Sequence, residues 1–300
     1  MTVEFTESDS EVFRRFIATE YAYFTPKGEP LCWPVTPYWY PDRGVLAIAT
    51  GLAYPTKADY AALNPKVALL FSDPTGSGLP DESHILVQGD ARVLSEDMQA
   101  NADRYVTELR ARFLSARIGI NPLTVRLLDF YLPRLWVEID PVAVERRKPN
   151  RPADGDLPRA QGLRSNLDAK DVVALRNVVT RHGQGVVTIR GSDGYPQMLR
   201  TSVTMQDDLV LLRESPGTGA ACLTMHQHTL RGTRFSAYMV RGELVDAGEA
   251  HVFIPRRLVG FFGNGAVFPL SVIPSVGRLR RRLGAELARR GKEMPKLRIP

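Results

Sequence analysis

The chain of 300 residues contains 44% hydrophobic and 24% charged residues, a composition typical of a folded globular protein. It excludes a disordered tail, a collagen, a coiled coil and a disulfide scaffold. At about 150 residues per domain, the length favours two domains. The two cysteines lie far apart in the sequence, which indicates a reducing, cytoplasmic environment.

The net charge of +6 resides in the C-terminal tail. Residues 278–300 contain nine basic and two acidic residues, and the rest of the chain has a net charge of −1. A nucleic-acid groove needs basic residues along one face of the body, so we expect no nucleic-acid partner. The N-terminus is acidic, without the apolar core of a signal peptide. The uncharged segment 258–277 contains two prolines and four glycines, so we expect no membrane span.

A segment rich in proline and glycine divides the chain. Residues 146–168 contain three prolines, two glycines and almost no apolar periodicity, which is typical of a linker. We therefore assign residues 1–147 to a first domain, 148–167 to a linker, and 168–300 to a second domain that includes the basic C-terminal helix.

Short apolar runs predict β-strands in both halves. In the first half they lie at 45–49, 67–71 and 84–94, with a polar hairpin at 23–28 and a helical stretch at 57–63. In the second half they lie at 186–194, 209–212 and 235–245, with a small-residue stretch at 219–223. Both halves place a Val-x-Gly-acid motif in a long strand, at 87–90 and 240–243. This pattern favours a mainly β (α+β) fold of two tandem antiparallel barrels.

Three segments predict peripheral helices, at residues 95–117, 168–181 and 276–287. In the last, a narrow stripe of leucines is surrounded by arginines, which indicates a surface helix packed on the body. An arm that covers a partner subunit or reaches an anionic ligand is the alternative.

The segment 33–71 carries the most chemical information. Thr50, Thr56 and Lys57 cluster where a predicted strand leads into a helix. Hydroxyl groups, free N–H groups at a helix start and an ammonium together can bind a phosphate. The alternative is an ordinary solvated helix cap.

This order of features resembles the pyridoxamine 5′-phosphate oxidase-like FMN-binding split-barrel family over about residues 10–145. The matching features are Pro34 and Pro37 on an aromatic strand, a strand ending in Thr50, then Lys57, Asn64-Pro65, the strand 87–93 and a closing strand at 136–144. The resemblance implies a six-stranded barrel and a redox cofactor: FMN, a deazaflavin coenzyme or, in some branches, heme. It implies that Thr50, Thr56 and Lys57 hold the phosphate. It also implies that Trp33, Val35, Thr36 and Tyr38 lie along the ring system.

Such barrels pair with the cofactor at their seam, so the resemblance implies a pseudo-dimeric monomer or a homodimer. Aligning Thr56 with Thr218 places Gly219 at the position of Lys57, and Leu212 at that of Thr50. The second half therefore lacks the phosphate lysine, and we expect one good site, in the first half. The second half would supply a wall of this site, with the candidates Arg200, Arg213 and His226.

Cys222, His226 and His228 are the candidate metal ligands. On a strand all three would share a face, whereas on a helix His228 would point away. The repeat alignment favours a helix, so we expect no metal centre here. A heme-ligating role for one histidine stays open.

These observations predict a flavin- or deazaflavin-dependent oxidoreductase acting on a small molecule. The alternatives are a heme-binding or heme-processing barrel and a binding module without a cofactor. The chain has no Walker loop, no Gly-x-Ser-x-Gly motif and no convincing carboxylate pair, which argues against phosphate-loop, hydrolase and glycosidase chemistry. The sequence names no catalytic acid or base.

Overall fold

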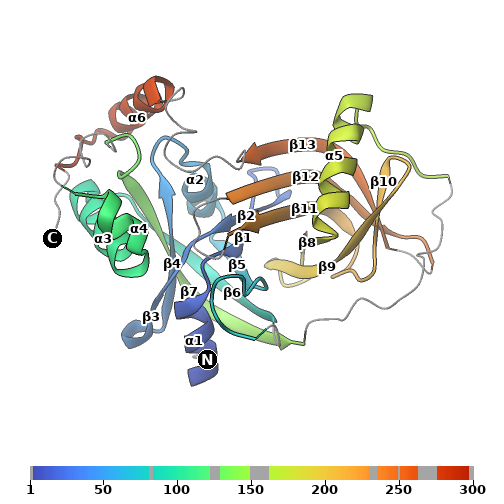
Figure 1. The fold of residues 1–300 in the computed structure, drawn as a ribbon, viewed down its shortest axis with the longest axis horizontal. Coiled ribbons are helices and arrows are strands. Elements are labelled where there is room, and N and C mark those ends of the chain that lie inside the picture. Colours follow the sequence, from blue (N-terminus) through green and yellow to red (C-terminus); the bar gives the residue numbers. More distant parts are fainter. Residues whose placement is uncertain are drawn as a thin grey trace.

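The computed structural model describes residues 3–80, 84–121, 129–148, 162–229, 235–248, 251–262 and 276–296. Two β-structures lie side by side, one from each half of the chain, with helices around them (Figure 1). The expected mainly β fold of antiparallel strands is confirmed. The linker expected at 148–167 lies mostly outside the described residues. No helix in the described ranges is long and apolar enough to cross a membrane.

The first half forms a seven-stranded sheet in the order β2-β1-β5-β6-β7-β4-β3. Its strands are β1 (Thr19–Phe24), β2 (Pro30–Val35), β3 (Pro37–Tyr40), β4 (Val45–Gly51), β5 (Lys66–Phe71), β6 (His84–Leu94) and β7 (Arg134–Arg147). Its helices are α1 (Glu7–Arg15), α2 (Thr56–Leu63), α3 (Met98–Arg112) and α4 (Leu114–Gly119). The single helix expected at 95–117 is thus two helices, which meet at Phe113, a residue with extended backbone.

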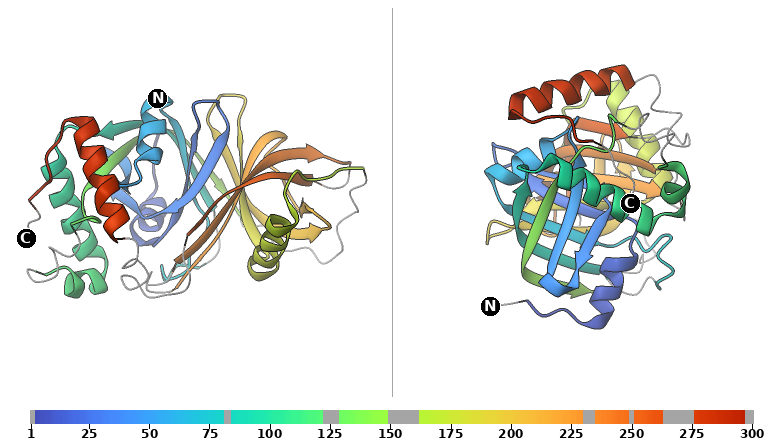
Figure 2. Two further views of the ribbon diagram at one scale, coloured as in Figure 1. Left: turned by 90° about the horizontal axis from the view of Figure 1, so that it is seen from above. Right: turned by 90° about the vertical axis from the view of Figure 1, so that its left-hand side faces the viewer.

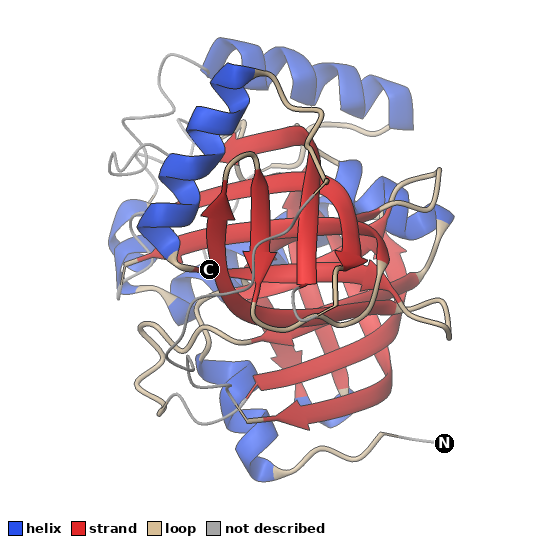
Figure 3. Ribbon diagram, turned by 90° about the vertical axis from the view of Figure 1, so that its right-hand side faces the viewer, coloured by secondary structure: helices blue, strands red, loops and turns tan. Residues whose placement is uncertain are grey.

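The second half forms a closed barrel in the order β10-β13-β12-β11-β8-β9, with α5 lying across it (Figure 3). Its elements are α5 (Ala169–His182), β8 (Gln184–Arg190), β9 (Pro196–Gln206), β10 (Leu209–Leu212), β11 (Gly219–His228), β12 (Phe235–Asp246) and β13 (His251–Phe262). Helix α5 begins at Asp168, whose side chain accepts a hydrogen bond from the Asp171 N–H, and ends at Gly183 in the left-handed conformation. An Asp at the N-cap and a left-handed glycine after the last turn are both common signals of helix boundaries.

The strand order repeats between the halves. β1, β5, β6, β7 and β4 follow one another in the first sheet as β8, β11, β12, β13 and β10 do in the barrel. The long strand β9 pairs with both β8 and β10 and so closes the barrel. Its counterpart in the first half is interrupted at Thr36, which separates β2 from β3.

The Val-x-Gly-acid motif marks the same irregularity in both halves. Gly89 lies opposite Pro141, and Gly242 lies opposite Pro255, each beside a shift in strand register. A Cβ atom would lie 2.6 Å from the Asp140 carbonyl oxygen at Gly89, and 2.3 Å from the Ile254 carbonyl oxygen at Gly242. Glycine is therefore required at both positions because the neighbouring strand approaches too closely for a side chain.

Helix α6 (Val276–Arg290) packs on the first half, although the sequence grouped it with the second. Figure 2 shows it on the side of the first half, away from the barrel. Its buried face consists of Leu279, Leu283 and Leu287, which belong to the same apolar core as the strands of the first half. Arg289 and Arg290 form ion pairs with Asp59 of α2. The leucine stripe is therefore the buried face of a surface helix packed on the body, which is the first of the two interpretations of the sequence.

The expected helix after residue 218 is wrong. Residues 219–228 form strand β11, which pairs with β8 and β12 and corresponds to β5. Only residues 213–218 connect β10 to β11, so the second half has no counterpart of α2. Matching the β3–β4 and β9–β10 registers puts Leu212 at the position of Ile48 rather than Thr50. The alignment of Thr56 with Thr218 fails because the repeat is shortened at this point.

Candidate functional site

A cavity of about 180 Å³ lies where β2 meets β3 in the first half. It is bounded by the ends of β4 and β7, the first turn of α2 and two tyrosines. Its lining residues are Pro34, Val35, Thr36, Tyr38, Ala49, Thr50, Gly51, Lys57, Tyr105, Tyr131 and Arg134. Two of its lining residues, Val35 and Thr36, lie where β2 ends and the strand is interrupted.

Arg134 is the buried cation of this cavity, with 8% of its surface exposed. Its guanidinium carbon lies 4.1 Å from the Tyr131 ring centre and 4.3 Å from the Tyr105 ring centre. Its Nε and Nη2 atoms have no hydrogen-bond partner among the described residues. Buried polar groups are normally hydrogen-bonded, so these two donors are suited to a ligand with acceptor atoms.

Gly51 makes room for this guanidinium. It pairs with Arg134 across β4 and β7. A Cβ atom at position 51 would lie 2.9 Å from Arg134 Nη1. A side chain there would push the guanidinium from its place between the two tyrosines.

Lys57 is the second cation. It lies half-buried in the first turn of α2, with its ammonium 5.7 Å from the Trp33 ring centre. Burial, with a smaller contribution from the charge of Arg134, lowers the pKa of Lys57 to about 8. In the part of the chain that the structure describes, neither Lys57 nor Arg134 forms an ion pair with a carboxylate. Two neighbouring cations without a counter-charge favour an anionic ligand.

The residues expected to hold a phosphate are only partly brought together. Thr50 and Lys57 both line the cavity, but Thr56 is exposed at the start of α2 and does not. The Thr50 hydroxyl also donates a hydrogen bond to the Tyr54 carbonyl oxygen at 3.2 Å. The two basic side chains are thus more important for the cavity than the free N–H groups at the start of α2, which the sequence analysis included in the phosphate site.

The residues expected along a ring system lie on the same side of the first half. Val35, Thr36 and Tyr38 line the cavity, and Trp33 lies beside Lys57. The Tyr38 ring is buried and packs against Trp136 at 4.8 Å between ring centres. It therefore supports the cavity wall from behind rather than offering a free aromatic face.

Sequence reasoning missed Arg134, Tyr105 and Tyr131. Residues 133–135 immediately precede the strand that the sequence identified at 136–144, but nothing in one sequence pairs Arg134 with Gly51. That pairing follows from the β4–β7 register. A buried arginine is rare enough that its position could not be inferred from composition.

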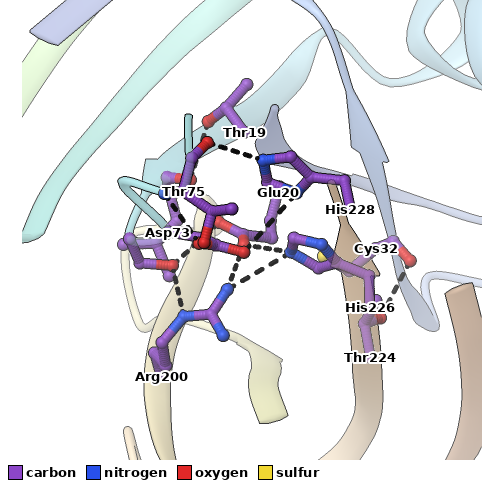
Figure 4. A network of polar contacts seen from close by, with 11 residues as sticks. Thr19, Glu20, Cys32, Asp73, Thr75, Arg200, Thr224, His226 and His228 are labelled. Carbon is purple, nitrogen blue, oxygen red and sulfur yellow. Dashed lines mark hydrogen bonds and ion pairs between the residues drawn. The ribbon is translucent and has the colours of Figure 1, made fainter. Parts of the chain in front are cut away.

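Arg200 and His226, the expected wall of the site, lie elsewhere. They belong to a buried cluster at the seam between the halves, shown in Figure 4. Arg213 follows β10 and is not among the lining residues; its N–H donates to the Ser202 carbonyl oxygen. The cavity is thus lined by residues of the first half alone, as far as the described residues show.

Glu20 of β1 is the centre of the seam cluster. Its carboxylate accepts hydrogen bonds from Arg200 at 2.5 Å and from the Ser72 hydroxyl at 2.9 Å, and lies 2.5 Å from His226 Nε2. Burial opposes ionisation of Glu20, but the Arg200 guanidinium and the contact with His226 outweigh it and hold its pKa at about 2. The carboxylate is therefore ionised, and Arg200 is committed to it.

Comparison with known proteins gives structural similarity only. No protein-family model and no curated protein matches the chain. Among solved structures, a conserved hypothetical protein from Mycobacterium tuberculosis is similar over 51% of this chain and 94% of its own, with 16% identity and a TM-score of 0.36. An F420 reductase is similar over 48% of this chain and 98% of its own, with 18% identity and a TM-score of 0.34.

A pyridoxamine 5′-phosphate oxidase-related FMN-binding protein from Nostoc punctiforme PCC 73102 is similar over 67% of this chain and 98% of its own. Its identity is 12% and its TM-score 0.35. Its name is that of the family that the sequence resembles. At these identities and TM-scores, what the cavity binds has to be inferred from this chain's own residues.

Proposed function

We propose that the cavity binds the phosphate end of a flavin-type cofactor, FMN or a deazaflavin coenzyme, and that the protein is an oxidoreductase acting on a small molecule. The observation that supports this most is the pair of basic side chains, Lys57 and buried Arg134, without a carboxylate partner in the described residues. The resemblance of residues 33–71 to the split-barrel family supports the choice of cofactor.

The chemistry of the residues fits a phosphate. The Arg134 Nε and Nη2 donors can bind two oxygens of one phosphate, as a guanidinium fork does. Lys57 adds a point charge, and the Thr50 side chain adds a polar group at the wall. When bound, the flavin or deazaflavin ring would supply hydride transfer.

The size of the cavity indicates that it holds one end of the ligand. Its volume of about 180 Å³ is below the roughly 300–1,000 Å³ of a complete small-molecule site. The rest of the cofactor would extend along the β2–β3 edge, past Val35 and Thr36. These side chains would position the cofactor and exclude water, without taking part in proton transfer.

The test is cofactor binding by the purified chain, followed by absorption and fluorescence on addition of FMN, a deazaflavin coenzyme or hemin. We expect binding of FMN or the deazaflavin, weakened about 10- to 100-fold by Arg134→Ala, the scale of a lost charge-assisted hydrogen bond. Arg92→Ala is the matched control, because Arg92 is 60% exposed and pairs with Glu138.

Three outcomes contradict the proposal. The chain binds neither flavin, or Arg134→Ala binds as tightly as the wild type, or hemin alone binds. The last outcome would favour the heme-binding alternative, although His226 lies outside the cavity and contacts Glu20.

A further inference from the structure

The seam cluster contains a second constellation, separate from the cavity. One ligand atom from each of Asp73, His226 and His228 lies within 4.8 Å of the other two. Both histidines are buried, and they project from the same face of β11 with ring centres 6.0 Å apart. Asp73 follows β5, so the three side chains come from both halves of the chain and meet at the seam (Figure 4).

The polar partners of the two histidines fix their orientation. His228 Nε2 lies 2.9 Å from the Thr75 carbonyl oxygen, to which it donates a hydrogen bond. Its Nδ1 faces Asp73 Oδ2 at 3.6 Å. His226 Nε2 contacts the Glu20 carboxylate at 2.5 Å. A backbone carbonyl or a carboxylate on one ring nitrogen is the usual support of a metal-binding histidine.

We propose that Asp73, His226 and His228 form a site for a divalent cation of the zinc class, which links the two halves at their seam. Two imidazoles and one carboxylate are donors that Zn²⁺ and similar cations accept. Zinc–nitrogen and zinc–oxygen distances of about 2.0–2.2 Å require the donors to approach by roughly an ångström. Rotation of the Asp73 side chain would supply most of this movement, because Asp73 lies after the end of β5 rather than within a strand.

The charges around the site permit a cation. Glu20 and Asp73 carry two negative charges, and Arg200 carries one positive charge that is committed to Glu20. With neutral imidazoles the cluster has a net charge of −1, which attracts a cation, and a bound divalent cation changes it to +1. Arg200 opposes the cation most directly, since its Nη2 lies 3.2 Å from His226 Nε2, and it limits the affinity.

Cys222 is not a ligand, although it shares the strand face with the two histidines. At about 3.3 Å per residue, it lies roughly 13 Å from His226 along the strand. Its thiol contacts Thr224 Oγ1 at 3.7 Å instead. Of the three candidate ligands expected from the sequence, only His226 and His228 therefore lie together. Asp73, from the other half, takes the place of Cys222 as the third ligand.

The experiment is titration of the full chain with Zn²⁺ and Co²⁺ after treatment with a chelator. We expect one equivalent to bind, with Co²⁺ d–d bands that lack thiolate charge transfer, and an increase in the unfolding temperature with Zn²⁺. Asp73→Asn and His228→Gln should each weaken binding at least about tenfold. His251→Gln, on β13 outside the cluster, and Cys222→Ser should bind as the wild type does.

The proposal is overturned if the wild type shows neither a Co²⁺ spectrum nor a thermal shift, or if Asp73→Asn binds normally. Asp73 has a side chain that is 16% exposed, so its variant is the one expected to fold. If both variants unfold, X-ray absorption of the Zn²⁺-loaded wild type decides, because the site requires two imidazole ligands. A spectrum that shows no imidazole ligand on the bound zinc would contradict the proposed site.

Discussion

The two halves use corresponding positions in opposite ways. When the registers of the first hairpins are matched, Pro30 corresponds to Pro196 and Pro34 therefore to Arg200. In the first half, Pro34 borders a cavity whose two cations have no carboxylate partner among the described residues. In the second half, Arg200 turns to the buried Glu20 of the first half and is neutralised by it.

The charged residues of the two halves should therefore differ in their effects on ligand binding and on the free energy of unfolding. An unpaired buried cation costs folding free energy, and proteins retain such groups where a ligand uses them. Removing one partner of a buried charge pair, in contrast, is strongly destabilising, because the other charge is left buried without compensation. Under the proposed function, the same fold thus provides an anion-binding site in one half and, in the other, a charged contact that joins the halves.

The largest expected effect is at Glu20. Glu20→Gln leaves the Arg200 guanidinium without its counter-charge in a buried place and should reduce the free energy of unfolding by about 3–5 kcal/mol. Urea denaturation in the presence of a chelator measures it. Cofactor binding by the folded fraction should be unchanged, because Glu20 does not line the cavity.

Glu29→Gln is the matched control at the rim of the seam. Glu29 pairs with Arg241 across the halves, but its side chain is 41% exposed, and we expect a loss below about 1 kcal/mol. Equal losses in the two variants would show that burial does not distinguish the two ion pairs.

The next largest effect is expected at Lys57. In contrast to Glu20→Gln, its replacement should weaken cofactor binding without lowering the stability of the protein. Lys57→Met removes a half-buried cation without a carboxylate partner, so the ligand-free protein should be as stable as the wild type or more stable. Affinity for FMN or the deazaflavin should fall about 10- to 30-fold, since one charge-assisted interaction is lost. Calorimetry and fluorescence titration measure the two quantities on the same sample.

Lys27→Met, an exposed lysine of the β1–β2 hairpin, serves as control and should change neither quantity. A Lys57→Met protein that loses stability but keeps its affinity would make Lys57 a structural residue. The comparison between the halves would then fail.

The sequence predicted the parts of this structure that depend on local chemistry. The mainly β character, helix α5, the leucine face of α6 and the repeated Gly89 and Gly242 motif follow from residue types at fixed spacing. Lys57 and Thr50 could be assigned to one site because the order of features in residues 33–71 resembles that of a known family.

The parts that failed depend on pairing across the fold. Arg134 enters the cavity through the register of β7 with β4, and Asp73 meets His226 and His228 only because the halves dock. The loss of the α2 counterpart misled the alignment of the halves, since residues 219–223 are small and suit a helix or a strand. Periodicity within one short segment cannot distinguish these alternatives.

A smaller effect is expected from pH. The pKa of Lys57 lies at about 8, below its ordinary value, so its ammonium loses its proton as the pH rises through 8. The phosphate is already a dianion above about pH 7, and Arg134 stays charged. Cofactor affinity should therefore fall by up to about tenfold between roughly pH 7 and 9.5. Lys57→Met should show no such decrease, and a parallel decrease in both proteins would assign the titration to another group.

The smallest expected effect is at Gly51. Gly51→Ala adds a methyl group 2.9 Å from Arg134 Nη1, and the guanidinium must shift by a few tenths of an ångström between its two tyrosines. Because a small displacement weakens a bidentate contact without removing the charge, we expect a three- to tenfold loss of affinity, about 0.6–1.4 kcal/mol. Gly284→Ala, whose Cβ would meet nothing within 4 Å, is the control.

If Gly51→Ala leaves the affinity unchanged while Arg134→Ala reduces it, the charge of Arg134 matters and its position does not. In that case the cavity attracts anions in general, and the selectivity for one cofactor must come from the β2–β3 edge.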